Sequence, residues 1–182
     1  MIKKLPWGIL VLGLLIALTG CATVKIYSSN PSMQTTSNEY FAAEFEPQEK
    51  DGQNYYVKFR TVITNKSAKD FQIDWEKTRY LLNGKSYGRF GFEGMTFEDL
   101  DKLKTQPLIT VKAGNTKSNL LFPLKLIARE NLKTTTMKPG KGPINPGPLP
   151  EGKNGIRLVV IQDGKEIKAE MNITIEAKQY TK

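Results

Sequence analysis

The chain has 182 residues, a formal charge of +9, one cysteine and no histidine. The lack of histidine excludes Ser-His-Asp and Cys-His catalysis and imidazole ligation of a metal. A single cysteine also excludes a disulfide within the chain, so the fold must depend on its hydrophobic core. A chain of this length can bury such a core, and we expect one folded domain.

Residues 1–20 have the organisation of a secretory signal peptide. Lys3 and Lys4 form a short basic region, and residues 7–18 are apolar. This apolar stretch is too short and too abruptly ended for a stable membrane span, which favours a signal peptide. The small residue Gly20 then precedes Cys21, the only cysteine.

The run Leu18-Thr19-Gly20-Cys21 resembles the lipobox of bacterial lipoproteins. The resemblance implies that the Cys21 thiol receives a diacylglycerol, that cleavage occurs before Cys21, and that the freed amine receives a fatty acid such as palmitate. Two or three acyl chains would anchor the protein durably, because each buried methylene contributes about 0.8 kcal/mol. Ordinary signal cleavage near Ala22, or an uncleaved signal that serves as an anchor, are the alternatives.

This resemblance also bears on location. In the family, an aspartate after the cysteine tends to retain lipoproteins on the inner membrane, and this chain has Ala22 there. We therefore expect a cell-envelope protein, held on the outer membrane and facing the periplasm if the cell has two membranes.

The basic charge is spread along the chain. Removal of residues 1–20 takes away two lysines and no acid, which lowers the formal charge from +9 to +7. A basic domain beside a membrane is attracted to anionic head groups, anionic envelope polymers or acidic protein partners. Export excludes nucleic acid as the expected partner, and dispersed lysines are also typical of a solubilising surface.

Residues 21–38 are polar and lack a sustained apolar period, which predicts a flexible tether, although residues 24–27 could add a short strand. From residue 39 onward the apolar residues alternate with polar ones. Residues 41–45, 55–63, 71–75 and 167–175 show the period of two that is typical of half-buried antiparallel strands. We expect residues 39–178 to form one domain.

Turn residues separate the expected strands. Asp163-Gly164 predicts a two-residue hairpin, and Asn83-Gly84 and residues 65–70 predict further turns. Strands are also expected at 108–112 and 119–127. Pro123 cannot donate to a ladder, so it predicts an edge or a bulge in the second of these strands.

Two other segments differ from this pattern. Thr96 can cap a short helix that has Glu98 and Asp99 in its first turn and lysines at its end. Residues 137–155 contain five prolines and five glycines, which predicts a long loop inside the domain, either exposed and disordered or used to bind a partner.

Seven or eight short strands with intervening turns predict an all-β fold, an antiparallel β-sandwich with one short helix. The strands at 62–65 and 71–75, and the run from Val111 through Asn115 to Pro123, resemble the small immunoglobulin-like domains of bacterial lipoproteins. The resemblance implies an immunoglobulin-like sandwich and assigns no catalytic residue.

The remaining candidate residues do not form a recognisable catalytic or metal-binding pattern. Glu98, Asp99 and Asp101 lack the spacing of a calcium-binding loop and are interpreted as helix-start acids. Four aromatic residues and an arginine are the candidate ligand site: Tyr80, Tyr87, Arg89, Phe90 and Phe92. Aromatic rings near an arginine can stack on a glycan or other small molecule, but cross-strand core packing explains the same rings.

The sequence thus favours a noncatalytic envelope lipoprotein without a cofactor, acting as a scaffold or docking module. The alternative is a lipoprotein that binds a glycan or small molecule at residues 80–94. A cleft lined by these rings, with Arg89 pointing inward, would support the alternative, and rings packed into the core would count against it.

Overall fold

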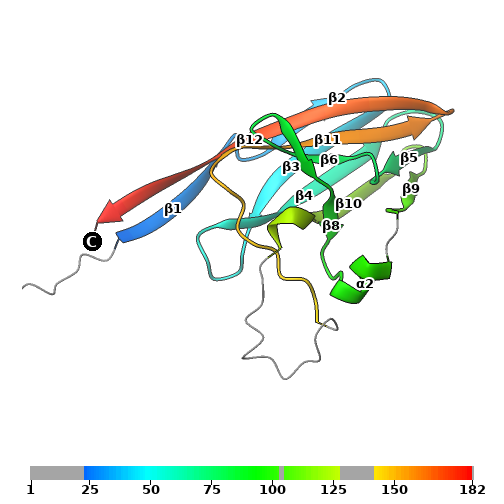
Figure 1. Ribbon diagram of the computed structural model, residues 1–182. Coiled ribbons are helices and arrows are strands. Elements are labelled where there is room, and N and C mark those ends of the chain that lie inside the picture. The colour runs from blue at the N-terminus through cyan, green and yellow to red at the C-terminus, as the bar shows by residue number, and fades with distance from the viewer. Residues whose placement is uncertain (1–22, 103–104, 128–141, 182) are drawn as a thin grey trace, which may run out of the picture.

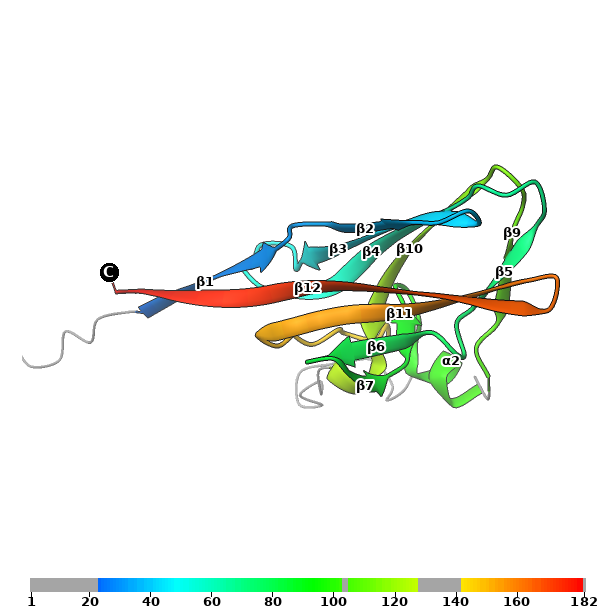
Figure 2. The same cartoon turned by 90° about the horizontal axis from the view of Figure 1, so that it is seen from above.

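The computed structural model describes residues 23–102, 105–127 and 142–181. Within these residues the chain is all-β: two antiparallel sheets pack against each other, with one short helix and one 3-10 turn (Figure 1, Figure 2). The predicted fold class, an all-β sandwich, is confirmed.

Most of the described elements are joined by short connections, and the longest connection, residues 127–151, precedes the strand that begins at Gly152. In chain order they are β1 (Thr23–Asn30), β2 (Gln34–Ser37), β3 (Phe41–Glu49), β4 (Tyr56–Asn65), β5 (Phe71–Asp74), β6 (Arg79–Leu82), β7 (Lys85–Gly88), β8 (Phe90–Phe92), α2 (Phe97–Lys102), β9 (Leu108–Val111), β10 (Thr116–Pro123), the 3-10 turn η2 (Leu124–Leu126), β11 (Gly152–Gln162) and β12 (Lys165–Thr181).

Each sheet is built from antiparallel neighbours. The first has the order β1-β12-β11-β5-β9, with β6 also pairing β11 and β7 pairing β6, and the second has the order β2-β3-β4-β10-β8. The long strand β12 changes partner along its length. It pairs with β11 from Lys165 to Ile175 and with β1 from Thr174 to Thr181. The end of β12 and the start of β1 therefore form a two-stranded ribbon that projects beyond the sandwich (Figure 1).

The core lies between the sheets and consists of the apolar positions of the alternating strands. Phe41, Ala43 and Phe45 of β3 are buried, and their neighbours in the strand are partly exposed. Phe45 stacks on Phe59 of β4 with 4.3 Å between ring centroids. From the other sheet, β11 and β12 contribute buried aliphatic residues such as Ile173. The period of two thus assigned the buried face correctly.

The predicted hairpin turns are also confirmed. Asp163 and Gly164 both have positive φ, 50° and 75°, and join β11 to β12. Asn83 and Gly84 have φ values of 51° and 76° and join β6 to β7. Positive φ at both central residues gives a turn whose twist matches the strands, which is why these dipeptides predict hairpins.

The side chain of Asn65, the last residue of β4, forms hydrogen bonds with the segments around the end of that strand. Its side chain is 1% exposed, and its amide nitrogen donates to the backbone oxygens of Lys69 and Val111, both at 2.9 Å. Its Oδ1 accepts from the backbone N–H and the hydroxyl of Ser67, at 3.0 and 2.8 Å. One buried side chain therefore joins the end of β4 to the turn before β5 and to the end of β9.

The helix is capped as predicted. The Thr96 hydroxyl accepts from the Asp99 N–H at 3.1 Å, and Asp99 Oδ2 accepts from the Thr96 N–H at 2.8 Å. These reciprocal bonds form a capping box at the start of α2.

Residues 23–37 differ from the predicted flexible tether. Apart from the short strand that the sequence allowed at 24–27, these residues were expected to lack regular structure. Instead, β1 pairs with β12 over its full length, and β2 pairs with β3. Backbone pairing with β12 and with the adjacent β3 holds this polar segment in regular structure.

Pro123 lies where β10 is paired on one side only, in agreement with the predicted edge, whereas the Pro/Gly-rich segment differs in part from expectation. Pro123 ends β10, where the strand has passed β4 and pairs only with β8, so its missing N–H breaks no ladder.

Of the Pro/Gly-rich segment, residues 137–141 lie outside the described residues, as do the preceding residues 128–136. In the part that is described, Ile144 and Leu149 are buried, and the Leu149 N–H donates to the Tyr56 oxygen at 2.8 Å. This part packs on the domain and is no exposed excursion.

We predict that Asn65→Ala lowers the free energy of unfolding by about 3 kcal/mol, because it leaves several buried backbone groups without partners. Chemical denaturation monitored by circular dichroism measures the change. Asn115→Ala, which alters an exposed side chain at the neighbouring turn, should stay within about 0.5 kcal/mol of the wild type. Equal stability of Asn65→Ala and wild type would contradict this role.

Candidate functional site

The predicted lipidation site, Cys21, lies outside the described residues, two positions before the first strand. Thr23 begins β1 and pairs with Thr181 of β12, so the two ends of the described chain lie side by side at the tip of the ribbon (Figure 1, Figure 2). A lipid on Cys21 would therefore be attached to the tip of a paired ribbon.

The two faces of this ribbon differ. Directly opposite residues of an antiparallel pair share a face, and successive pairs alternate. The pairs Val24–Tyr180 and Ile26–Lys178 share the outer face. The opposite face carries Tyr27, which packs against the core cluster. The outer face is therefore the face that points away from the domain.

The predicted ligand-binding rings are distributed between the core and its margin. Tyr80 and Phe90 are buried, with 5.8 Å between ring centroids, and Phe92 packs edge-on against Trp75 at 5.2 Å. Burial raises the pKa of the Tyr80 phenol above its ordinary value, and its hydroxyl donates to Asn154 Oδ1 in the core. This arrangement favours the packing interpretation of Tyr80, Phe90 and Phe92.

Arg89 and Tyr87 have partners within the protein. Arg89 Nη1 lies 2.8 Å from Glu76 Oε2, the oxygen that also accepts from the Gln106 N–H at 2.9 Å. The Gln106 N–H is the largest cause of the lowered pKa of Glu76; burial opposes it, and Arg89 adds to the lowering. Tyr87 is 37% exposed, with Lys125 Nζ 5.1 Å from its ring centroid. Arg89 is thus engaged by a carboxylate of the domain.

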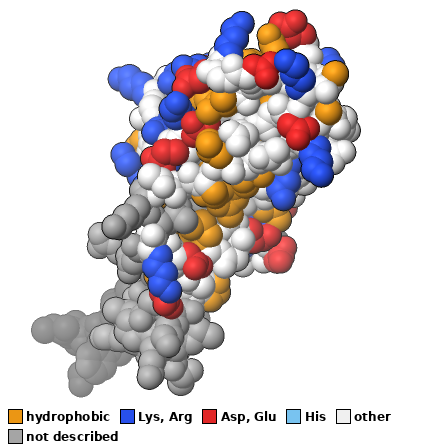
Figure 3. Space-filling view, turned by 90° about the vertical axis from the view of Figure 1, so that its right-hand side faces the viewer, with side chains coloured by type: hydrophobic (Ala, Val, Ile, Leu, Met, Phe, Trp, Pro, Cys, Tyr) orange, Lys and Arg blue, Asp and Glu red, His pale blue; other side chains and the backbone are white. Residues whose placement is uncertain are grey.

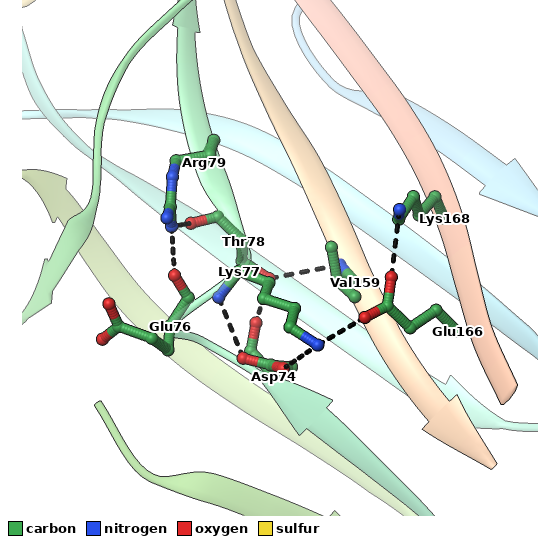
Figure 4. Close-up of polar contacts among 8 residues, drawn as sticks. All are labelled: Asp74, Glu76, Lys77, Thr78, Arg79, Val159, Glu166 and Lys168. Atoms are coloured by element: carbon green, nitrogen blue, oxygen red, sulfur yellow. Dashed lines mark hydrogen bonds and ion pairs between the residues drawn. The ribbon is translucent and has the colours of Figure 1, made fainter. Parts of the chain in front are cut away.

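The turn between β5 and β6 holds a dense polar group, shown in Figure 4. The buried Asp74 accepts from the Lys77 N–H at 2.9 Å through Oδ1, and its backbone oxygen accepts from the Thr78 hydroxyl at 2.7 Å. The Thr78 hydroxyl in turn accepts from the Val159 N–H at 3.2 Å, and the Lys77 ammonium pairs with Glu166. These contacts join the turn to β11 and β12, so we interpret the group as structural.

The acidic residues at the start of α2 have structural partners as well. The Thr96 N–H and hydroxyl lower the pKa of Asp99, and Glu98 pairs with Lys102 at 2.7 Å. The side chain of Asp101 lies outside the described part. Among the described residues, no group of three or more cysteine or acidic side chains is arranged to hold a metal ion.

A cleft that the sequence did not predict lies beside the Pro/Gly-rich segment. It has a volume of about 420 Å³ and lies between the β3–β4 turn, the segment after β8 and residues 143–146. Val57, Phe122 and Ile144 form apolar parts of its wall, and the ion pair of Lys58 with Glu93 borders it. None of the five predicted ligand-binding residues lines this cleft. In the sequence only the prolines indicated this region, because the residues that line the cleft come from segments far apart along the chain.

Charged side chains of both signs are interleaved on the surface seen in Figure 3, around a band of apolar side chains. Many of the basic residues are paired: Arg60 lies 2.8 Å from Glu46, and Arg157 lies 2.6 Å from Glu170. These pairs agree with the dispersed charge of the sequence and do not form a block of one sign.

Among the described residues, no helix has the length and apolar character needed to cross a membrane. Comparison of the chain with protein-family models, with curated proteins and with solved structures found no match.

We predict that Tyr80→Phe lowers the free energy of unfolding by about 1–2 kcal/mol, because Asn154 Oδ1 loses its buried donor. Tyr87→Phe removes a partly exposed hydroxyl and should change stability by less than about 0.5 kcal/mol. Thermal unfolding of the two variants beside the wild type measures both effects. If Tyr80→Phe unfolds at the wild-type temperature, the hydroxyl is not part of the core network.

Proposed function

We propose that the protein is a noncatalytic, lipid-anchored lipoprotein of the cell envelope, with an immunoglobulin-like domain that acts as a scaffold or docking module. The lipid on Cys21 holds the domain at a membrane, which is the outer membrane facing the periplasm if the cell has two. Its partner is an envelope protein or an anionic envelope polymer.

One observation carries this proposal: the strand that follows Cys21 after a single intervening residue is paired along its whole length with the last strand. A lipid there would be joined to the domain through backbone hydrogen bonds, without a long flexible linker. Such a connection keeps the domain close to the membrane and limits its orientations, as suits a scaffold or docking module.

Two features of the domain are suited to docking. The cleft beside residues 143–146 combines apolar walls with charged residues at its border. Strand β9 lies at an edge of the first sheet, where an extended segment of a partner can add a strand, and Leu108 on it is 50% exposed. The ionisable groups described above serve ion pairs, turns and the helix cap, which supports a binding role over a catalytic one.

We predict that Cys21→Ser abolishes labelling of the protein by radioactive fatty acid in cells, because the serine hydroxyl cannot form the thioether. A matched control is the double variant Cys21→Ser/Ser28→Cys, which moves the only cysteine onto exposed β1. It should also remain unlabelled, since the lipobox requires the cysteine directly after Gly20. Labelling of Cys21→Ser would refute the anchor.

Crosslinked pull-down of the wild type beside Cys21→Ser tests the docking role in the same strains. Envelope components recovered with the wild type and lost with Cys21→Ser would identify the partner. Recovery of no partner from either protein would count against docking and favour the ligand-binding alternative.

A further inference from the structure

The tip of the β1–β12 ribbon carries a group of exposed large hydrophobic residues. Val24, Ile26 and Tyr180 are 45%, 49% and 53% exposed. They account for three of the six large hydrophobic residues exposed in the described part of the chain. All three lie on the outer face, because Val24 pairs with Tyr180 and Ile26 is the next residue but one along β1. We call this group, with Lys178 opposite Ile26, the tip face.

The tip face has a polarity gradient along the ribbon. At the tip, the pair Val24–Tyr180 is apolar and aromatic, and the next pair on this face combines Ile26 with Lys178. The following pair, Ser28 with Glu176, is polar and acidic. Apolar character is thus greatest at the end nearest Cys21 and is replaced by a carboxylate toward the sandwich.

This gradient matches the order of a membrane interface. Tyrosine is enriched where the hydrocarbon meets the head groups, and a lysine beside apolar residues can extend its ammonium to the phosphates. Val24 is three residues after Cys21, and an extended chain spans at most about 3.6 Å per residue. A lipid on Cys21 would therefore hold Val24 within about 11 Å of the bilayer boundary.

A second copy of the chain fits the tip face less well. A stable protein interface buries about 800 Å² on each partner, which takes some 20–30 residues. Three apolar side chains on a narrow ribbon form a much smaller contact. A contact with a bilayer needs no minimum area of this size, because it adds to the proposed acyl anchor, which already holds the protein at the membrane.

We propose that the tip face lies in the head-group region of a bilayer containing anionic lipid, as a second membrane contact beside the acyl chains. This inference rests on the proposed lipid anchor for the placement of the ribbon. The two contacts together fix the direction in which the sandwich projects from the membrane.

The test uses the unacylated mature chain, residues 21–182 with Cys21→Ser, which contains the whole described fold. It is mixed with vesicles of phosphatidylcholine, with or without about 30% phosphatidylglycerol, and the bound fraction is measured by sedimentation. We expect binding to the anionic vesicles. Addition of Val24→Ser and Ile26→Ser should lower the partition coefficient by about tenfold, and Lys178→Gln should lower it by about fivefold.

Met33→Ser is the matched control, because Met33 is an exposed hydrophobic residue, 38% exposed, that lies between β1 and β2, beyond the end of β1 opposite the tip. It should leave binding unchanged, and thermal unfolding should show that all variants fold. The proposal is overturned if the unacylated chain binds neither kind of vesicle, or if Met33→Ser weakens binding as much as the tip-face changes. It is also overturned if the tip-face changes convert a dimer to a monomer without lipid.

Fatty-acid labelling separates this proposal from the anchor itself. If the wild type is labelled but its unacylated chain does not bind vesicles, the anchor stands and the tip-face contact is refuted. If the wild type is not labelled but its unacylated chain binds anionic vesicles, the anchor is refuted and the tip-face contact stands.

Discussion

The pairing of the first described strand with the last is the interaction on which the account depends. Among the described strands β1 pairs only with β12, and β12 continues from β1 into a pairing with the whole length of β11 at the core. Because β12 passes between these partners without a break, a force applied near Cys21 is carried by backbone hydrogen bonds into the sandwich. A lipid anchor at Cys21, as proposed, would then move with the domain as one body, which suits the proposed scaffold role.

Local sequence patterns predicted much of this fold. The alternation of β3 and β12 records which side chains face the core, and Asp163-Gly164 accepts the positive φ values that a tight hairpin needs. Thr96 and Asp99 cap the helix through bonds that span three residues. Each of these features depends on neighbours in the chain, so a short window of sequence contains the necessary information.

Features that depend on distant partners were missed. Most of β1 has no strong strand pattern, and its pairing depends on the far end of the chain. The polar strand β2 was also missed, although its partner β3 begins only four residues after it ends. Ile144 and Leu149 are buried although prolines surround them: Ile144 lies with Val57 and Phe122 in the wall of the cleft, and Leu149 belongs to the core cluster. The aromatic residues show the same limit: composition suggested a binding site, but whether Tyr80 and Phe90 face a cleft or the core is decided by how the sheets pack.

Hydrogen exchange of the backbone amides in β1 tests the central claim most directly. Mass spectrometry of the unacylated mature chain can compare a peptide covering residues 24–30 with one covering 174–180. The account predicts that both peptides exchange far more slowly than an unstructured chain and lose protection together when β1 is interrupted by Ile26→Pro. Exchange of residues 24–30 at the rate of an unstructured chain, beside a protected β11, would mean that Cys21 leads into a flexible tether and would contradict the account.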